Sequence, residues 1–126
     1  MVAAGGGGIP VIRDGDGLHG VEAVIDKDLT AAALARDVRA QVLVIATDVP
    51  NAVVDYGTPD ARPVGRVTLA EMESLAAAGH FASGSMGPKV EAALRFVRAG
   101  GTRSVITALD RIADALSGTV GTVIER

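Results

Sequence analysis

Short runs of apolar residues alternate along the chain with longer segments in which apolar residues recur every three or four positions. Nearly continuous runs of valine, isoleucine, leucine and alanine are typical of strands that are covered on both faces of a sheet. Four runs predict strands: 9–13, 41–47, 103–109 and 119–125. The Asp- and Gly-rich stretch 14–20 predicts a turn or short hairpin after the first of them. Strands that alternate with helices predict an α/β layered fold.

Four longer segments have helical periodicity: 28–40, 68–79, 88–101 and 109–118. The first is apolar almost all round, so we expect it to be buried. Thr68, followed by Glu71 three positions later, predicts a capping box at the start of the second. Pro88 is predicted at the first position of the third, where a proline gives up only an amide that the helix leaves unbonded.

The remaining pattern is weaker. In the last helical segment, Ile112, Ala115 and Leu116 are expected to face inward. The segment 50–67, with three prolines and mixed charge, is expected to be an irregular excursion between layers. No repeat or linker divides the chain, so we expect a single domain over residues 1–126.

Composition narrows the class of protein. Apolar residues make up 48% of the chain, but there are only two phenylalanines, one tyrosine and no tryptophan. The net charge of −3 provides no basic stripe, so nucleic acid is not an expected partner. No apolar run approaches the roughly 18–20 residues that cross a bilayer, so no membrane is expected either. The absence of cysteine agrees with a cytoplasmic location, and we expect a soluble globular protein there.

The twelve basic residues include only two lysines, Lys27 and Lys89, and both lie near predicted helix starts. Lys89 ends the stretch "SGSMGPK", where a cation is unfavourable because a helix N-terminus already carries about half a positive charge. Together with free amides at that end, it predicts an anion site; the alternative is a surface lysine. Lys27 lies between Asp26 and Asp28, either of which could instead be a helix cap. A shared phosphate site, with a carboxylate fixing both ammonium groups, is the functional interpretation.

Two other stretches are candidates for binding. Gly5–Gly8 could let the backbone approach a phosphate, although no P-loop or dinucleotide fingerprint follows, and a flexible lead-in is the alternative. Thr47 and Asp48 follow a predicted strand at its carboxyl end, where open α/β sheets bind ligands; the alternative is an ordinary turn. No set of His, Asp and Glu residues has the spacing of metal ligands, so no metal held by the protein is expected.

Several motifs in one order carry a specific resemblance: GGGGIPVI (5–12), VEAVIDKDLTAAALA (21–35), TDV (47–49), FASGSMGPKVEAALRFV (81–97), ALDR (108–111) and ALSGTVGT (115–122). The chain resembles carbamate kinase, of the amino-acid kinase superfamily, over essentially its whole length. The resemblance covers only the C-terminal part of that enzyme. It implies a three-layer αβα sandwich, of which this chain would be the nucleotide-side half.

The resemblance also implies roles for individual residues. Lys27 and Lys89 would contact the transferring phosphate, and Asp28 would organise them. A nucleotide site would be formed by Thr47, Asp48, Val49, Gly84, Ser85, Met86 and Gly87, with Gly5, Gly6, Gly7 and Gly8 as a phosphate loop. The implied substrates are ADP or ATP, with Mg²⁺ carried mainly by the nucleotide, and carbamoyl phosphate or carbamate. The implied assembly is a homo-oligomer, or pairing with an N-terminal half that is absent here.

Three functions therefore remain open at this stage. The first is a carbamate kinase segment for reversible phosphoryl transfer between carbamoyl phosphate and ADP, expected to be inactive without the N-terminal half. The second is a nucleotide-binding module without catalysis. The third is a chain that serves assembly alone.

Overall fold

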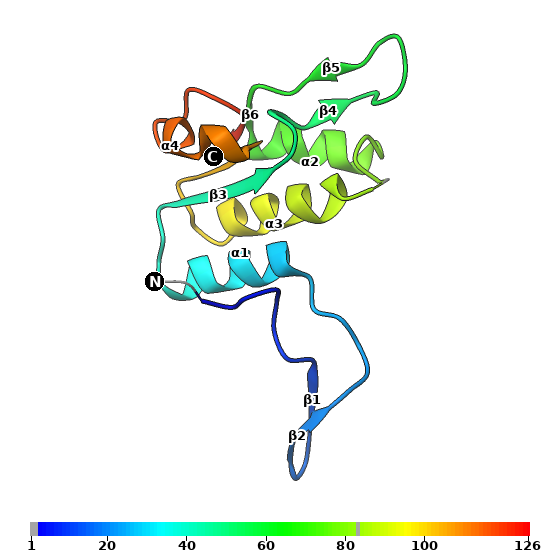
Figure 1. Ribbon diagram of the computed structural model, residues 1–126, viewed down its shortest axis with the longest axis vertical. Coiled ribbons are helices and arrows are strands. Elements are labelled where there is room, and N and C mark those ends of the chain that lie inside the picture. The colour runs from blue at the N-terminus through cyan, green and yellow to red at the C-terminus, as the bar shows by residue number, and fades with distance from the viewer. Residues whose placement is uncertain (1–2, 83) are drawn as a thin grey trace.

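The computed structural model describes residues 3–82 and 84–126 (Figure 1); Ser83, within the resemblance segment 81–97, lies outside these ranges. The helices are α1 (Lys27–Asp37), α2 (Leu69–Ala77), α3 (Met86–Arg98) and α4 (Ile112–Ala115), the last preceded by a 3₁₀ turn at Leu109–Arg111. The strands are β1 (Val11–Asp14), β2 (Gly17–Gly20), β3 (Val42–Thr47), β4 (Val53–Val54), β5 (Arg62–Pro63), β6 (Arg66–Thr68), β7 (Arg103–Ala108) and β8 (Thr122–Glu125).

The main sheet has the strand order β3-β7-β8-β6. β3 and β7 run parallel, with a register from Val42↔Arg103 to Thr47↔Ala108, while β8 is antiparallel to β7 and parallel to β6. The carboxyl ends of β3 and β7 therefore meet at one edge of the sheet. This is the edge at which open α/β sheets bind ligands.

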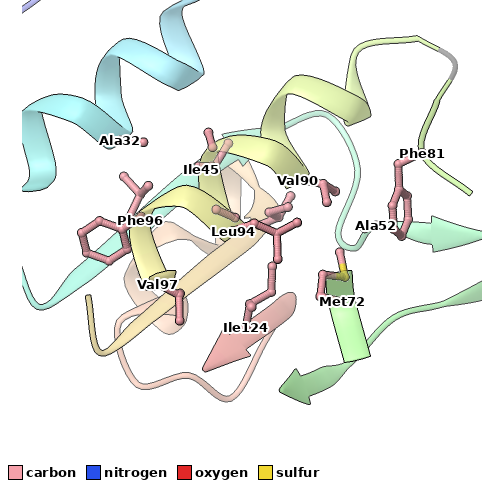
Figure 2. Close-up of a cluster of buried hydrophobic side chains, with 14 of the residues drawn as sticks. Ala32, Ile45, Ala52, Met72, Phe81, Val90, Leu94, Phe96, Val97 and Ile124 are labelled. Atoms are coloured by element: carbon pink, nitrogen blue, oxygen red, sulfur yellow. The ribbon is translucent and has the colours of Figure 1, made fainter. Parts of the chain in front are cut away.

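Successive residues of a strand point to opposite faces of the sheet. Both faces of this sheet are covered, but one core cluster is much larger than the other. Ile106 and Ile124 face the larger core, in which Figure 2 shows the side chains of α3 lying beside those of β8 and α2. Val105 and Val123 face the other way and pack with Ala115 of the short helix α4. The predicted α/β layering is confirmed.

The expectation that helix 28–40 is buried is wrong. In α1 only Asp28, Ala32 and Ala35 are buried, whereas Leu34 is 40% exposed. Val38, which follows α1 within the predicted range, is 66% exposed. The physical reason is that α1 packs against α3, so one stripe of small side chains suffices for the contact. Leu29 and Ala31 are partly buried against the same core, and α1 lies at the edge of the molecule beside α3 (Figure 1).

The last helix also departs from its prediction. Ala115 is buried as expected, but Ile112 and Leu116 are exposed. α4 comprises only four residues, and a single turn presents one position at a time to the sheet. The second face of the sheet is therefore thinly covered in the described part of the chain.

The segment 50–67 is more ordered than its composition predicts. β4 and β5 pair antiparallel, and β6 forms an edge strand of the main sheet beside β8. Its buried residues Ala52, Val54 and Val64 join the larger core. The predicted hairpin at 14–20 is present as a separate β1–β2 ribbon that projects from the body, so run 9–13 does not belong to the main sheet (Figure 1).

Candidate functional site

The start of α1 separates the roles of its two aspartates. The side chain of Asp26 is the helix cap: its Oδ1 accepts from the backbone N–H groups of Asp28 and Leu29 at 2.8 and 2.9 Å. Because the cap is supplied by Asp26, the carboxylate of Asp28 is left to make tertiary contacts. Of the two cap interpretations, only the one for Asp26 is confirmed.

One carboxylate oxygen joins both lysines of the chain. Asp28 Oδ2 lies 3.1 Å from Lys89 Nζ and 3.3 Å from Lys27 Nζ. The side chains of Asp28 and Lys89 are only 11% and 7% exposed, whereas that of Lys27 is 60% exposed. Lys27, Asp28 and Lys89 are called the lysine cluster below. Its two positive charges share one negative charge, so its net charge is positive, and the exposed ammonium group of Lys27 faces solvent.

The start of α3 differs from the prediction. The helix begins at Met86, so Pro88 is its third residue rather than its first. The amides that helix geometry leaves free are those of Ser85, Met86 and Gly87. Lys89 Nζ also donates to the carbonyl of Ser85 at 3.3 Å. The unfavourable position of Lys89 near the helix N-terminus is thus offset by an anion within the chain, Asp28.

Gly87 allows the chain before α3 to fold back onto the helix. A Cβ at this position would lie 2.8 Å from the carbonyl oxygen of Phe81. Such a distance is shorter than a non-bonded contact allows, so a larger residue would push Phe81 away from the start of α3. Phe81 lines the pocket described next.

A cavity of about 250 Å³ lies between the segment after β3 and the segment before α3. Its lining residues are Asp48, Val49, Asn51, Val53, Tyr56, His80, Phe81, Gly84, Ser85 and Met86. The structure therefore brings together five residues predicted for the nucleotide site. Thr47 and Gly87 are not in the lining; the Thr47 hydroxyl instead lies 3.0 Å from Asp48 Oδ1.

Sequence reasoning missed the other wall of this cavity. Asn51, Val53 and Tyr56 come from the segment expected to be irregular, and His80 and Phe81 were not assigned to it. His80 Nδ1 lies 3.2 Å from Asp55 Oδ1, a contact that ties the β4–β5 segment to the end of α2. The sequence offered one signal for this wall: Tyr56, the only tyrosine of the chain, follows the carboxyl end of the predicted strand 41–47.

Gly5–Gly8 lies against the residue that leads toward α1. A Cβ on Gly7, whose φ is +145°, would lie 2.4 Å from the carbonyl oxygen of Ile25, and one on Gly8 would contact the Ile25 side chain. Glycine is needed here for a close approach between two backbone segments. These glycines are not among the cavity residues, and their predicted role as a phosphate loop stays a prediction.

Residues 3–82 and 84–126 show neither a metal-ligand cluster nor a membrane-spanning helix. No group of three or more His, Asp or Glu side chains could hold a metal ion there. None of the helices in these ranges has the length and apolar character to cross a membrane.

Comparisons with known proteins identify the family. A family model described as the amino acid kinase family matches residues 1–108. A carbamate kinase from Thermococcus kodakarensis is 52% identical over 126 residues, which are all of this chain and 40% of the relative; one from Giardia intestinalis is 47% identical over 98% of the chain and 39% of its own length. A solved carbamate kinase from Giardia lamblia bound to AMP-PNP superposes with a TM-score of 0.91 at 48% identity, over 96% of this chain and 42% of that one.

The fold resembles those enzymes throughout, but the chain spans about 40% of the length of the curated relatives that it matches. Since the family model covers well over half of the residues, the family itself is established. The chain therefore belongs to the amino acid kinase family.

Proposed function

We propose that this chain forms the nucleotide-binding, charge-carrying part of a carbamate kinase-type phosphotransferase. The reaction is reversible phosphoryl transfer between carbamoyl phosphate and ADP, which gives ATP and carbamate. The observation that carries the proposal is the single oxygen of Asp28 that contacts Lys27 and Lys89. In this proposal residues 1–126 act as one unit, the nucleotide-side half of a three-layer αβα sandwich.

The 250 Å³ cavity is the proposed site of the nucleotide base. Val49, Val53 and Phe81 give it apolar walls, and Asp48 and Ser85 add polar groups that can orient a ligand. The relative that binds AMP-PNP supports a nucleotide as the ligand of this fold. Mg²⁺ would enter with the nucleotide as part of the substrate.

The cavity is linked to the lysines through its own wall. Ser85 lines the cavity, and its carbonyl accepts from Lys89 Nζ, which in turn contacts Asp28. A nucleotide whose base occupies the cavity can therefore direct its phosphates toward the free amides at the start of α3.

The two lysines have different tasks in this proposal. Lys89, buried and held from two sides, fixes the position of Asp28. Lys27 is exposed, and within residues 3–82 and 84–126 its ammonium group is paired with Asp28 alone. In this proposal that group follows charge as it moves between donor and acceptor oxygens. Catalysis of this type consists of positioning and electrostatic stabilisation.

A nucleotide-binding module without catalysis is the second candidate. It is favoured by the share of the relatives that this chain covers, about 40%. Phosphoryl transfer requires charge stabilisation on several sides of the moving group and a bound acceptor. Pairing with a second chain, or with the remaining part of a longer one, would complete the site in the enzymatic proposal.

Calorimetric titration with Mg–ADP tests the proposal. We expect Lys27→Ala to weaken binding about tenfold or more, the loss of one charge-assisted contact. Arg95→Ala is the matched control, because Arg95 is a similarly exposed cation that pairs with Glu91 on the outer face of α3. Equal affinities of the two variants, or no binding by the unsubstituted chain, would remove the case for a nucleotide site at this cluster.

A further inference from the structure

A second, larger cavity lies on the other side of the segment that follows β3. Its volume is about 600 Å³, within the range of small-molecule sites. Asn51 lines both cavities, while Arg66, Thr107 and Arg111 belong to the larger one alone. Thr107 lies near the carboxyl end of β7, and Asn51 follows the carboxyl end of the parallel strand β3. This cavity is therefore also at the carboxyl edge of the sheet.

The hydroxyl of Thr107 has no hydrogen-bond partner within residues 3–82 and 84–126, although the residue is only 1% exposed. The neighbouring buried hydroxyls are both bonded: Ser104 Oγ donates to the carbonyl of Leu43, and Thr122 Oγ1 donates to that of Val64. Buried polar groups in folded proteins are almost always paired. Thr107 is also one of the residues that line the cavity, so a ligand bound there is a candidate partner for its hydroxyl.

The backbone opposite Thr107 is built for close approach. Gly121 has a φ of +81°, and a Cβ there would lie 2.9 Å from the Thr107 Cβ and 2.4 Å from the carbonyl oxygen of Ile106. Only glycine lets this loop approach the end of β7 so closely. Gly121 therefore places no side chain against Thr107.

The charges around the cavity favour an anion. Arg66 donates to Glu125 and to the carbonyl of Gly118, so its guanidinium is already occupied. Arg111 contacts Asp114 through Nε alone, and its two terminal nitrogens have no partner in the described part of the chain. Those nitrogens form the planar fork that matches a carboxylate or a phosphate.

A third arginine, Arg103, adds a further positive charge. Arg103 donates to the carbonyls of Leu116 and Ser117 and pairs with no carboxylate in the described ranges. Among these five side chains, the three guanidinium groups of Arg66, Arg103 and Arg111 outnumber the two carboxylates of Glu125 and Asp114.

We propose that the cavity at Thr107 and Arg111 is a second binding site, for a small molecule that bears an oxyanion, either a carboxylate or a phosphate. In this proposal the Thr107 hydroxyl donates a hydrogen bond to the anion, and the two terminal nitrogens of Arg111 donate hydrogen bonds to it as well. The proposal is independent of phosphoryl transfer at the lysine cluster. Because Asn51 separates the two cavities and donates to Val64 O at 2.9 Å, occupancy here borders directly on the nucleotide pocket.

Two-dimensional ¹H–¹⁵N NMR titrations of the 126-residue chain test the proposal, with sodium phosphate and sodium acetate as separate probes at constant ionic strength. We expect saturable shifts of the Thr107, Thr119 and Gly121 amides with at least one probe. Saturation by only one of them identifies the group as phosphate or carboxylate.

Variants assign the effect to the site. We expect Arg111→Gln and Thr107→Val, which is close in shape, each to raise the apparent Kd at these amides about fivefold or more. Arg95→Gln controls for loss of a surface charge, and Lys27→Gln separates this site from phosphate bound at the lysine cluster; both should leave the Kd unchanged. The same spectra report whether each variant is folded. Shifts confined to residues near Lys27 and Lys89, or an unchanged Kd in both Arg111→Gln and Thr107→Val, would overturn the proposal.

Discussion

At the scale of single residues, Asp28 joins stability to the proposed chemistry. Its carboxylate is buried at the first turn of α1 and compensates the buried ammonium of Lys89 on α3. A buried charge pair contributes little over an apolar pair of the same shape, but removal of one partner leaves the other charge uncompensated. The asymmetry makes Asp28 indispensable to Lys89, whereas the exposed Lys27 can be lost without that penalty.

Asp28→Asn removes the charge and keeps the shape of the side chain. We expect it to lower the free energy of unfolding by about 3–5 kcal/mol, because Lys89 is left buried without its counter-ion. Asp37→Asn is the control: Asp37 lies on the same helix in an exposed pair with Arg36, and its loss should cost about 1 kcal/mol or less. Urea unfolding of both variants measures the difference, and similar losses would mean that the Asp28–Lys89 pair is not a compensated buried charge.

At the scale of elements, the start of α2 is a local device with a pH signature. Thr68 Oγ1 accepts from the backbone N–H of Glu71, and the Glu71 carboxylate accepts from the backbone N–H of Thr68 at 2.7 Å. The predicted capping box is therefore confirmed. The backbone hydrogen bond from Thr68, followed by its hydroxyl, holds the pKa of Glu71 below its usual value of 4.5.

The sign of the pH effect follows from that direction. A carboxyl whose pKa is lowered by folding contributes stability that is complete above its unfolded pKa and is lost as the pH falls through the folded pKa. We expect Glu71→Gln, which keeps a hydrogen-bonding box, to flatten the decline in unfolding free energy below about pH 4.5. Urea unfolding from about pH 6 to about pH 3 measures it, with the exposed Glu22→Gln as control. Parallel profiles for Glu71→Gln and the unsubstituted chain would contradict the assignment.

What the sequence could predict among the elements depended on the strength of local patterns. β3, β7 and β8 lie within the predicted runs because a continuous apolar stretch admits few alternatives. β4, β5 and β6 were missed because strands of two or three residues have no periodicity of their own, and their pairing is decided by contacts with distant segments. The burial of α1 was misjudged because an alanine-rich pattern does not say which stripe a partner helix will cover.

The candidate site, too, was predicted only in part. The segments 47–49 and 84–86 were grouped by resemblance, and the structure places Asp48, Val49 and 84–86 around one cavity. The position of His80 in the other wall could not be predicted, because its contact with Asp55 joins residues that are far apart in the sequence. The dual contact of Asp28 agrees with the organising role that the resemblance implied, and that role in catalysis stays a prediction.

At the scale of the whole molecule, apolar surface remains exposed over several elements. The outer edge of β3 has no partner strand in the described part of the chain, although its residues are apolar. The exposed large apolar residues include Ile9, Val24, Leu34, Val38, Leu109 and Leu116. Unpaired apolar edges and broad apolar surfaces mark contacts with other chains or segments. These surfaces are consistent with the proposed pairing, either between copies or with the remaining part of a carbamate kinase-type chain.

The last prediction concerns catalysis by these 126 residues alone. They supply Lys27, Lys89 and Asp28, but the chain spans about 40% of the relatives that it matches. Loss of one well-placed donor typically lowers the rate of such reactions by about 10²–10³, and an acceptor that is not held in line lowers it further. We therefore expect no measurable ATP formation from carbamoyl phosphate and ADP in a coupled assay, under conditions where calorimetry shows that Mg–ADP is bound. Addition of the N-terminal part of a similar carbamate kinase, refolded together with this chain, should restore some turnover, and Lys27→Ala should abolish what is restored. Robust turnover by the 126 residues alone, lost in Lys27→Ala, would instead show that the described cluster and cavity already form a sufficient site.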